Sequence, residues 1–186
     1  MGRFLAFVGL YLLCAQVLAN QEANLSFNSD GLRASYFNEL SSNNLVVDLG
    51  WLHHKDKGDV VHAGIHLVDQ ASSGRNRLVG GLGGRVLYSD GDRSNQSGFA
   101  FPVGGFLTFT PSQFDRISLT GSAYFAPEIL TIGDMDKYQE YGLRLGYNLL
   151  REATVYVGAR YVKGGYDGAQ SVRYDTGMHV GLSVRF

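Results

Sequence analysis

Apolar and polar side chains alternate along most of this chain, and clusters of Gly, Asn, Asp and Ser separate the alternating segments. Side chains along a β-strand point alternately to the two faces of a sheet, so this pattern predicts strands. No convincing amphipathic helix is seen after the N-terminal segment. Ten strands are predicted, at Ala23 to Asn28, Leu32 to Phe37, Leu45 to His53, Val60 to Val68, Leu78 to Tyr88, Phe99 to Phe109, Ile117 to Phe125, Tyr138 to Leu149, Ala153 to Val162 and Tyr174 to Phe186.

The two faces of the predicted strands differ in chemistry. One face is apolar and carries essentially no charge, as in Leu45, Val47, Leu49 and Trp51. The other face is mostly Gly, Ser, Thr and Tyr with a few charged residues, and it has few of the Lys and Glu residues that a water-facing exterior needs. A soluble, lipocalin-like barrel would place the apolar face inside. The small polar face instead favours a narrow lumen, with the apolar face turned to lipid.

Aromatic residues on the apolar face gather near the strand ends, as expected where side chains meet the two interfaces of a membrane. The predicted outer band holds Trp51, Tyr88, Phe99, Phe101, Phe125, Tyr141, Tyr161 and Tyr174, and the inner band holds Phe109, Tyr147 and Phe186. The predicted fold class is therefore all-β, an antiparallel up-and-down transmembrane β-barrel. Ten strands are favoured. Eight strands, with the N-terminal hairpin packed elsewhere, are the alternative, because alternation fails near Phe37.

The connections predict which end of the barrel faces outward, since barrels of this class have short periplasmic turns and longer external loops. Periplasmic turns are expected at Leu40 to Asn44, Asp69 to Arg77, Thr110 to Arg116 and Leu150 to Glu152. External loops are expected at Ser29 to Gly31, His54 to Asp59, Ser89 to Gly98, Ala126 to Lys137 and Lys163 to Arg173. Asp69 to Arg77 is long for a periplasmic turn.

The N-terminal segment predicts export from the cytoplasm. Arg3, the apolar run from Phe4 to Ala15 and the small residues up to Ala19 have the pattern of a signal peptide over residues 1–19. The run is shorter than the ~18–20 apolar residues of a membrane-spanning helix. Cys14 lies in this run, but lipidation there would leave the cleavage signal at Ala19 unexplained. The barrel domain is then residues 20–186, which contain no cysteine for a disulfide or metal site.

The last strand resembles the C-terminal signal of Gram-negative outer-membrane barrels, which the barrel-insertion machinery reads. Its apolar set includes Val180, Leu182, Val184 and Phe186. The expected location is the bacterial outer membrane. The expected partners are outer-membrane lipid, lipopolysaccharide and, during biogenesis, the insertion machinery, with the protein a monomer.

Composition excludes several classes of function. The sequence has 25 Gly, 11 Tyr and 11 Phe, only 18% charged residues and a net charge of −1. Such a chain has no basic surface for nucleic acid, and no motif calls for a cofactor. Charged residues on the polar face are Asp48, Arg85, Glu140, Arg144 and Arg160. Because a buried charge is costly alone, they are expected to form carboxylate–guanidinium pairs in the lumen.

Four histidines are the candidates for chemistry. His53 and His54 lie at the predicted outer rim, where barrel lipases and acyltransferases carry their catalytic groups, but no serine lies in or beside their hairpin. His62 and His66 are about 13 Å apart along an extended strand, too far to share one metal ion. Hydrogen-bonded lumenal histidines are the favoured interpretation, and neither a catalytic nor a metal site is predicted.

In size, signal peptide, glycine and tyrosine content and Phe ending, the whole chain resembles the YfaZ family of small Gram-negative outer-membrane proteins. The resemblance assigns no functional residue. The favoured function is a non-enzymatic integral barrel with a structural, surface-interaction or restricted small-solute role. A narrow channel for small solutes, a lipid-modifying enzyme and a soluble periplasmic ligand-binding barrel are the alternatives.

Overall fold

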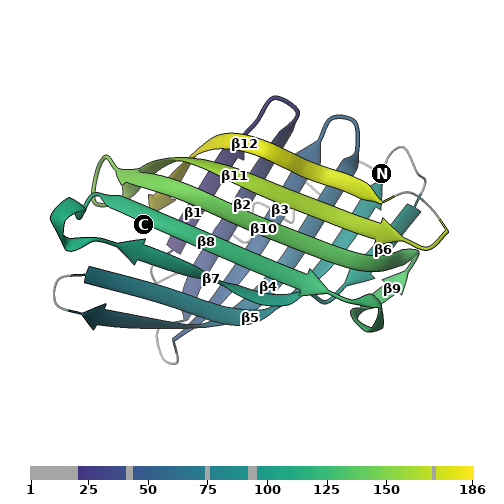
Figure 1. Cartoon of the computed structure of the whole chain (residues 1–186), viewed down its shortest axis with the longest axis horizontal. Coiled ribbons are helices and arrows are strands. Elements are labelled where there is room, and N and C mark those ends of the chain that lie inside the picture. Colours follow the sequence, from purple (N-terminus) through teal and green to yellow (C-terminus); the bar gives the residue numbers. More distant parts are fainter. Residues whose placement is uncertain (1–20, 41–43, 74–75, 92–95, 169–170) are drawn as a thin grey trace.

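The computed structural model describes residues 21–40, 44–73, 76–91, 96–168 and 171–186, which form a β-barrel (Figure 1). The predicted signal peptide at residues 1–19, with Cys14, lies outside these residues. No helix in the described part is long and apolar enough to cross a membrane. The strands are β1 (Gln21–Phe27), β2 (Gly31–Leu40), β3 (Leu45–His54), β4 (Gly58–Ser73), β5 (Asn76–Gly91), β6 (Gln96–Ala100), β7 (Val103–Thr110), β8 (Ile117–Ala126), β9 (Thr131–Gly133), β10 (Met135–Asn148), β11 (Ala153–Tyr166) and β12 (Val172–Arg185).

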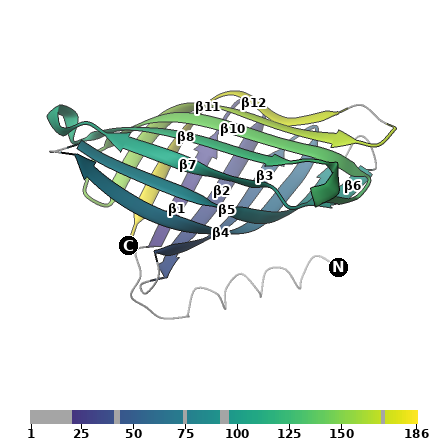
Figure 2. The same cartoon turned by 60° about the horizontal axis from the view of Figure 1, so that its bottom comes forward.

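The sheet closes on itself because β1 pairs with both β2 and β12. At this seam Ala23 faces Val184 in the register, and backbone hydrogen bonds join Gln21 and Phe186 in both directions at 3.1 and 3.0 Å. Strands β1 to β4 form the wall opposite β7, β8 and β10 (Figures 1 and 2). The N-terminal hairpin is thus part of the wall. The antiparallel barrel of ten strands is confirmed, and the eight-stranded alternative is wrong.

Strands β6 and β7 are two halves of one barrel strand that bends at Phe101 and Pro102. A single straight strand from Phe99 to Phe109 was predicted, so the bend is a correction. Proline has no N–H for the ladder, although the Pro102 carbonyl still accepts a hydrogen bond from the Arg85 N–H at 2.9 Å. Beyond the bend, β7 pairs with β8, whereas β6 pairs with the short strand β9.

Several strands are longer than their sequence pattern predicts. The expected turn from Asp69 to Arg77 is mostly strand, because β4 and β5 continue to pair as far as Ser73 and Asn76. The expected outer loop from Lys163 to Arg173 shrinks similarly, since β11 continues to Tyr166 and β12 begins at Val172. Most of the residues added to these strands are polar or glycine, so hydropathy gave little signal that the hydrogen-bonded ladder continues.

The outer surface of the barrel is apolar on all sides. Leu82, Met178 and Leu67 have exposed fractions of 75%, 71% and 61%. Other exposed apolar residues include Leu49, Trp51, Val61, Ile65, Leu119, Leu143, Leu145 and Val157. Soluble proteins rarely expose a continuous apolar surface of this extent. The apolar face therefore contacts lipid, and the soluble-barrel alternative is wrong.

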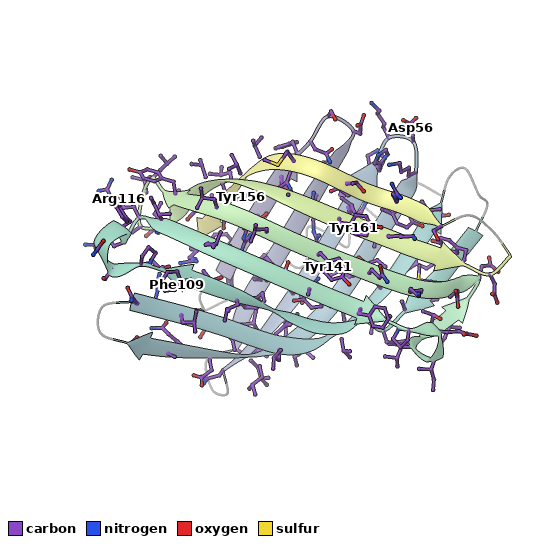
Figure 3. All side chains as sticks on the ribbon, in the orientation of Figure 1. Asp56, Phe109, Arg116, Tyr141, Tyr156 and Tyr161 are labelled. Carbon is purple, nitrogen blue, oxygen red and sulfur yellow. The ribbon has the colours of Figure 1, made fainter. Side chains whose placement is uncertain are left out.

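Aromatic side chains lie near both ends of this surface. Figure 3 shows Phe109 near one end, close to the turn that carries Arg116, and Tyr141 and Tyr161 nearer the other end. The rings of Tyr141 and Tyr161 stack with their centroids 6.4 Å apart. Tyr174 differs from its predicted place in the outer band, because it is fully buried.

A β-bulge explains the placement of Tyr174. Val162 faces Asp175 and Lys163 faces Arg173, so Tyr174 is an extra residue on β12 with no partner on β11. Two successive side chains, Tyr174 and Asp175, then point into the lumen. Strict alternation through this region placed Tyr174 on the wrong face.

In the wall formed by β5, β7 and β8, glycine lets the backbones of neighbouring strands approach one another closely. A Cβ atom added to Gly104 would lie 2.0 Å from the carbonyl oxygen of Ala123, a backbone atom that cannot move aside. A Cβ on Gly121 in the neighbouring strand would meet nothing within 4 Å. The close approach at Gly104 is therefore a requirement of the barrel wall.

We predict that Gly104→Ala lowers the free energy of unfolding by about 1–3 kcal/mol through overpacking, whereas Gly121→Ala changes it little. Urea unfolding in lipid vesicles, followed by the fluorescence of Trp51, measures the difference. Equal unfolding midpoints for the two variants would contradict the close approach at Gly104.

Candidate functional site

The lumen has three layers along the barrel axis, and the outermost layer is apolar. It joins the ends of β3, β5, β8, β11 and β12 that lie far from the chain termini, and each of its residues is at most 4% exposed. These residues are Leu52, Val60, Leu87, Ala100, Ala126, Met135, Tyr138, Val162, Tyr166 and Tyr174. The hydroxyl of Tyr166 is hydrogen bonded to Tyr174 and, at 2.8 Å, to Ser89. We call this set the outer apolar layer.

Asp48 is one centre of the middle layer and is fully buried. His62 Nε2 lies 2.9 Å from one carboxylate oxygen, His66 Nδ1 lies 3.1 Å from the other, and Arg85 Nε lies 3.1 Å away. A glycine makes room for this contact, since a Cβ on Gly64 would lie 2.3 Å from Asp48. His62 and His66, too far apart to share one metal ion by the sequence argument, thus share one carboxylate.

Glu140 is the second centre of the middle layer. Arg33 forms an ion pair with it at 2.7 Å, Arg85 lies 3.6 Å away, and the Tyr138 hydroxyl donates a hydrogen bond at 2.7 Å. Arg85 therefore connects Glu140 to Asp48.

Tyr124 supports the arginine that links the two centres. The Arg85 guanidinium lies 3.7 Å from the centroid of the Tyr124 ring, in cation–π geometry. The hydroxyl of the same tyrosine is hydrogen bonded to His66 Nε2 at 2.9 Å. The groups around Asp48 and Glu140 thus form one network, which we call the central ion layer.

Arg160 lies beside this layer and has its own partners. Its Nε forms an ion pair with Asp175 at 2.6 Å, and its Nη1 lies 3.3 Å from the Ser26 hydroxyl. Asn28 donates a second hydrogen bond to Asp175 at 2.6 Å. The sequence identified Arg160 as a lumenal charge but missed Asp175, although alternation with Gly177 and His179 places Asp175 on the lumenal face.

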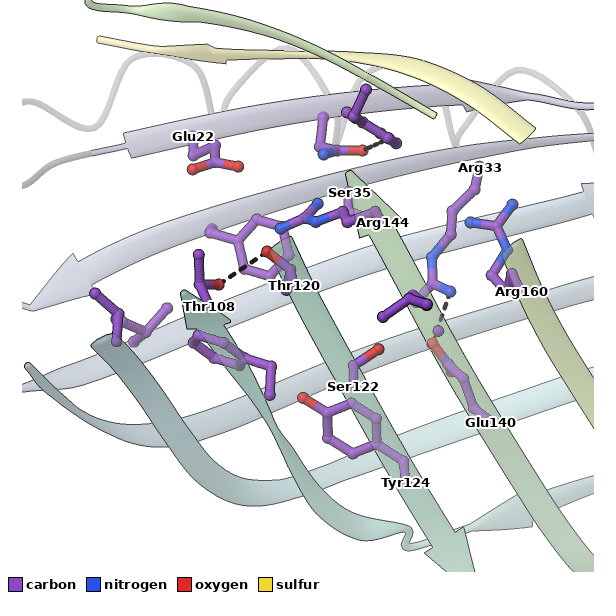
Figure 4. Close-up of a pocket in the computed structure, with 18 of the residues that line it drawn as sticks. Glu22, Arg33, Ser35, Thr108, Thr120, Ser122, Tyr124, Glu140, Arg144 and Arg160 are labelled. Carbon is purple, nitrogen blue, oxygen red and sulfur yellow. Dashed lines mark hydrogen bonds and ion pairs between the residues drawn. The ribbon is translucent and has the colours of Figure 1, made fainter. Parts of the chain in front are cut away.

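The third layer is a cavity of about 500 Å³ in the half of the lumen near the chain termini (Figure 4). Gln21, Glu39 and Arg77 line it at the rim that carries the chain termini, and Arg33, Arg85 and Glu140 line it at mid-barrel. No residue of the outer apolar layer lines it. The cavity thus begins at the end with the chain termini, which is expected to face the periplasm, and stops at the central ion layer.

Arg144 projects into this cavity and differs from the other predicted lumenal charges. Its guanidinium lies 5.4 Å from the centroid of the Tyr156 ring. Among the described residues it forms no ion pair with a carboxylate, so the expected pairing is not found for Arg144. Glu22, whose charge it feels at longer range, is bonded to Arg185 and Ser183.

The two rim histidines have separate environments. His53 Nδ1 lies 2.9 Å from Asp59, and Trp51 donates a hydrogen bond to the same carboxylate at 2.8 Å, on the outer surface of the barrel. His54 is buried, and its Nδ1 accepts the Asp56 N–H at 3.1 Å. No hydrogen bond among the described residues joins a serine hydroxyl to a histidine, and no group of three or more His, Cys, Asp or Glu side chains in the described part is placed to hold a metal ion.

The outer rim also carries an ion pair between two turns. Lys55, after β3, bonds the Asp30 carboxylate, after β1, and its backbone N–H donates to the Asp30 carbonyl at 3.0 Å. The hydrogen bond from Lys55 holds the pKa of Asp30 below its ordinary value. This contact joins the first two outer turns.

The residues proposed as an insertion signal all face outward. Val180, Leu182, Val184 and Phe186 have exposed fractions of 57%, 44%, 38% and 65%. Their role in insertion stays a prediction.

Solved outer-membrane proteins include structures similar to this barrel. The outer-membrane channel DcaP of Acinetobacter baumannii has a TM-score of 0.40 and 13% sequence identity over 88% of this chain. OccK5 (OpdH) of Pseudomonas aeruginosa has a TM-score of 0.39 and 12% identity over 89% of this chain. The chain spans about half of DcaP, 54% of its length, and 62% of OccK5.

Similarity of sequence identifies the family of this chain. The chain is 28% identical over 143 residues to "Outer membrane protein YfaZ" of Escherichia coli (strain K12), covering 76% of this chain and 75% of that protein. A family model described as "YfaZ precursor" matches residues 3–186. The word precursor agrees with the expected signal peptide, and cleavage after Ala19 stays a prediction. The chain belongs to the YfaZ family, and it is an outer-membrane β-barrel protein.

Proposed function

We propose that this protein is a non-enzymatic, non-conducting barrel that is closed at its outer end and opens a polar cavity to the periplasm. The outer apolar layer carries this proposal. Val162 and Tyr174 are fully buried there, and Leu52, Val60 and Leu87 are at most 4% exposed. Moving a hydrated ion or polar solute through such a layer requires the loss of its water without compensating hydrogen bonds.

The central ion layer supports closure as a second barrier. Its carboxylates and guanidinium groups neutralise one another, so a passing ion finds few free charges that could replace its hydration shell. Asp48 is completely buried, and Arg85 is 8% exposed. A ten-stranded barrel has a lumen only slightly wider than the one that side chains fill in an eight-stranded barrel. The central ion layer therefore adds to the barrier that the outer apolar layer sets.

A narrow channel is the second candidate, and one observation favours it. The cavity already occupies the periplasmic half of the lumen and is lined by arginine and hydroxyl side chains, the groups of a polar solute path. Only the outer apolar layer and the central ion layer separate it from the outer surface. A conducting state would require the outer layer to open.

The lipid-modifying enzyme has less support. His53 contacts Asp59 on the lipid-facing surface, but no serine hydroxyl in the described residues reaches that pair to act as a nucleophile. The buried His54 contacts a backbone N–H. We propose that the rim histidines are structural, and that the barrel works as a monomer whose partners are membrane lipid, lipopolysaccharide and the insertion machinery.

We predict that the purified protein shows no discrete conductance steps in planar bilayers. The double substitution Tyr166→Ala and Tyr174→Ala removes two rings of the outer apolar layer and is expected to produce small steps. Tyr141→Ala with Tyr161→Ala, which removes two stacked rings from the lipid face, is the matched control and should stay silent. Heat-modifiable gel mobility verifies that each barrel is folded. Steps from the unsubstituted protein would refute closure.

We also predict that Arg85→Ala lowers the free energy of unfolding by about 3–5 kcal/mol, because it leaves two buried carboxylates with one cationic partner fewer. Arg116→Ala, in an exposed turn, should change stability by less than about 0.5 kcal/mol. Unfolding in vesicles followed by Trp51 fluorescence measures both values. Arg85→Ala should nevertheless remain non-conducting, since the outer apolar layer is intact. Conductance in this variant would place the barrier in the central ion layer instead.

A further inference from the structure

Positively charged side chains from facing parts of the barrel wall gather around the periplasmic cavity. Arg33 comes from β2, Arg144 from β10 and Arg160 from β11, and all three line the cavity (Figure 4). The charge of Arg33 acts unfavourably on the charge of Arg160. His179, on β12, lines the same cavity. The three arginines therefore form one cationic cluster, with His179 beside it.

The nearby carboxylates do not neutralise the whole cluster. Glu140 is bonded to Arg33 and Tyr138, and Asp175 is bonded to Arg160 and Asn28. Each of these acids already has a cationic partner. Arg144 has no carboxylate in contact within the described part of the chain, which leaves it as the free positive charge of the cluster.

Buried donors in the cluster also lack partners. Arg160 is 8% exposed, yet its Nη2 has no hydrogen-bond partner, and the Asn24 side-chain nitrogen in the same cavity has none either. His179 Nδ1, which donates or accepts according to the tautomer, is likewise buried and unpartnered. A buried donor without an acceptor costs about 1–3 kcal/mol, so these atoms are unusual in a folded protein. An anionic oxygen in the cavity would accept from them and reduce the repulsion among the arginines.

We propose that the cavity binds a small anion bearing a carboxylate or phosphate group, held between Arg144 and the free Nη2 of Arg160. This inference deepens the proposed function and rests on it, since a barrel closed outside presents the cavity to periplasmic solutes alone. Arginine is suited to both groups because its planar fork can donate two parallel hydrogen bonds. The volume of about 500 Å³ lies within the range of small-molecule sites, about 300–1,000 Å³.

Hydroxyl side chains beside the arginines suggest a hydroxylated ligand body. The same cavity is lined by Ser35, Thr108, Thr120 and Ser122, whose hydroxyl groups both donate and accept hydrogen bonds. Thr108 and Thr120 are bonded to one another at 2.9 Å. Together with the Asn24 amide, these groups match a polyhydroxylated anion of the size of a sugar acid or sugar phosphate.

Titration calorimetry on the protein extracted from membranes in mild detergent tests this proposal. The probes are inorganic phosphate, gluconate, glucose 6-phosphate and neutral glucose. Binding of at least one anion, with no heat from glucose, is expected, and comparing gluconate with glucose 6-phosphate shows which anionic group is preferred. Arg144→Gln should weaken binding at least tenfold and Arg144→Lys less. Arg151→Gln, in an exposed turn outside the cavity, should bind as the unsubstituted protein does.

The outcomes separate this inference from the proposed function. Absence of binding by all three anions, or equal affinity in Arg144→Gln and the unsubstituted protein, overturns the anion site. Heat-modifiable mobility of the variants excludes loss of folding as the cause of weaker binding. Bilayer conductance is recorded on the same preparations. A conducting barrel overturns closure whether or not anions bind, whereas a silent barrel without binding overturns the anion site alone.

Discussion

The structure depends on one constraint, which is that lipid offers no hydrogen-bond partner to a polypeptide backbone. A sheet in a membrane must therefore have no free edge. Here β1 meets β12, and the ladder continues to reciprocal bonds between Gln21 and Phe186. Closure determines the remaining features, because it forces alternate side chains either outward to lipid or inward to a narrow lumen. The two faces then need opposite chemistry, which is the pattern seen along the chain.

The lumen is organised by what can be packed in a small, closed space. Charged side chains there must find partners inside the barrel, and Asp48 and Glu140 achieve this through shared contacts with Arg85. Glycines on neighbouring strands provide the room, as Gly64 does beside Asp48. Apolar side chains fill the outer end, whereas the periplasmic end keeps a cavity and an arginine without a carboxylate. The two ends of the lumen therefore differ because one is filled by apolar side chains and the other keeps a polar cavity, and no single residue accounts for this difference.

The sequence predicted the wall of the barrel well, because face and strand number follow from local alternation. It also placed Asp48, Arg85, Glu140, Arg144 and Arg160 in the lumen, where the structure has them. It could not predict which charges meet, since partners such as Arg33 and Glu140 are 107 positions apart and face one another across the barrel. Arg33 was missed because its strand alternates poorly. Asp175 was missed because it lies at the start of a predicted strand, beside a predicted loop, although alternation places it on the lumenal face.

The three layers of the lumen could not be predicted from the sequence either. Alternation shows which face a residue lies on, but it does not show which residues of other strands lie at the same depth in the barrel.

Side-specific cysteine labelling tests the closure of the outer end most directly, since the one natural cysteine, Cys14, lies in the expected signal peptide. Ser122→Cys places a thiol in the periplasmic cavity. In vesicles of known orientation, a membrane-impermeant thiol reagent should modify it from the periplasmic side only. Equal rates of modification from both sides would contradict a lumen closed at its outer end.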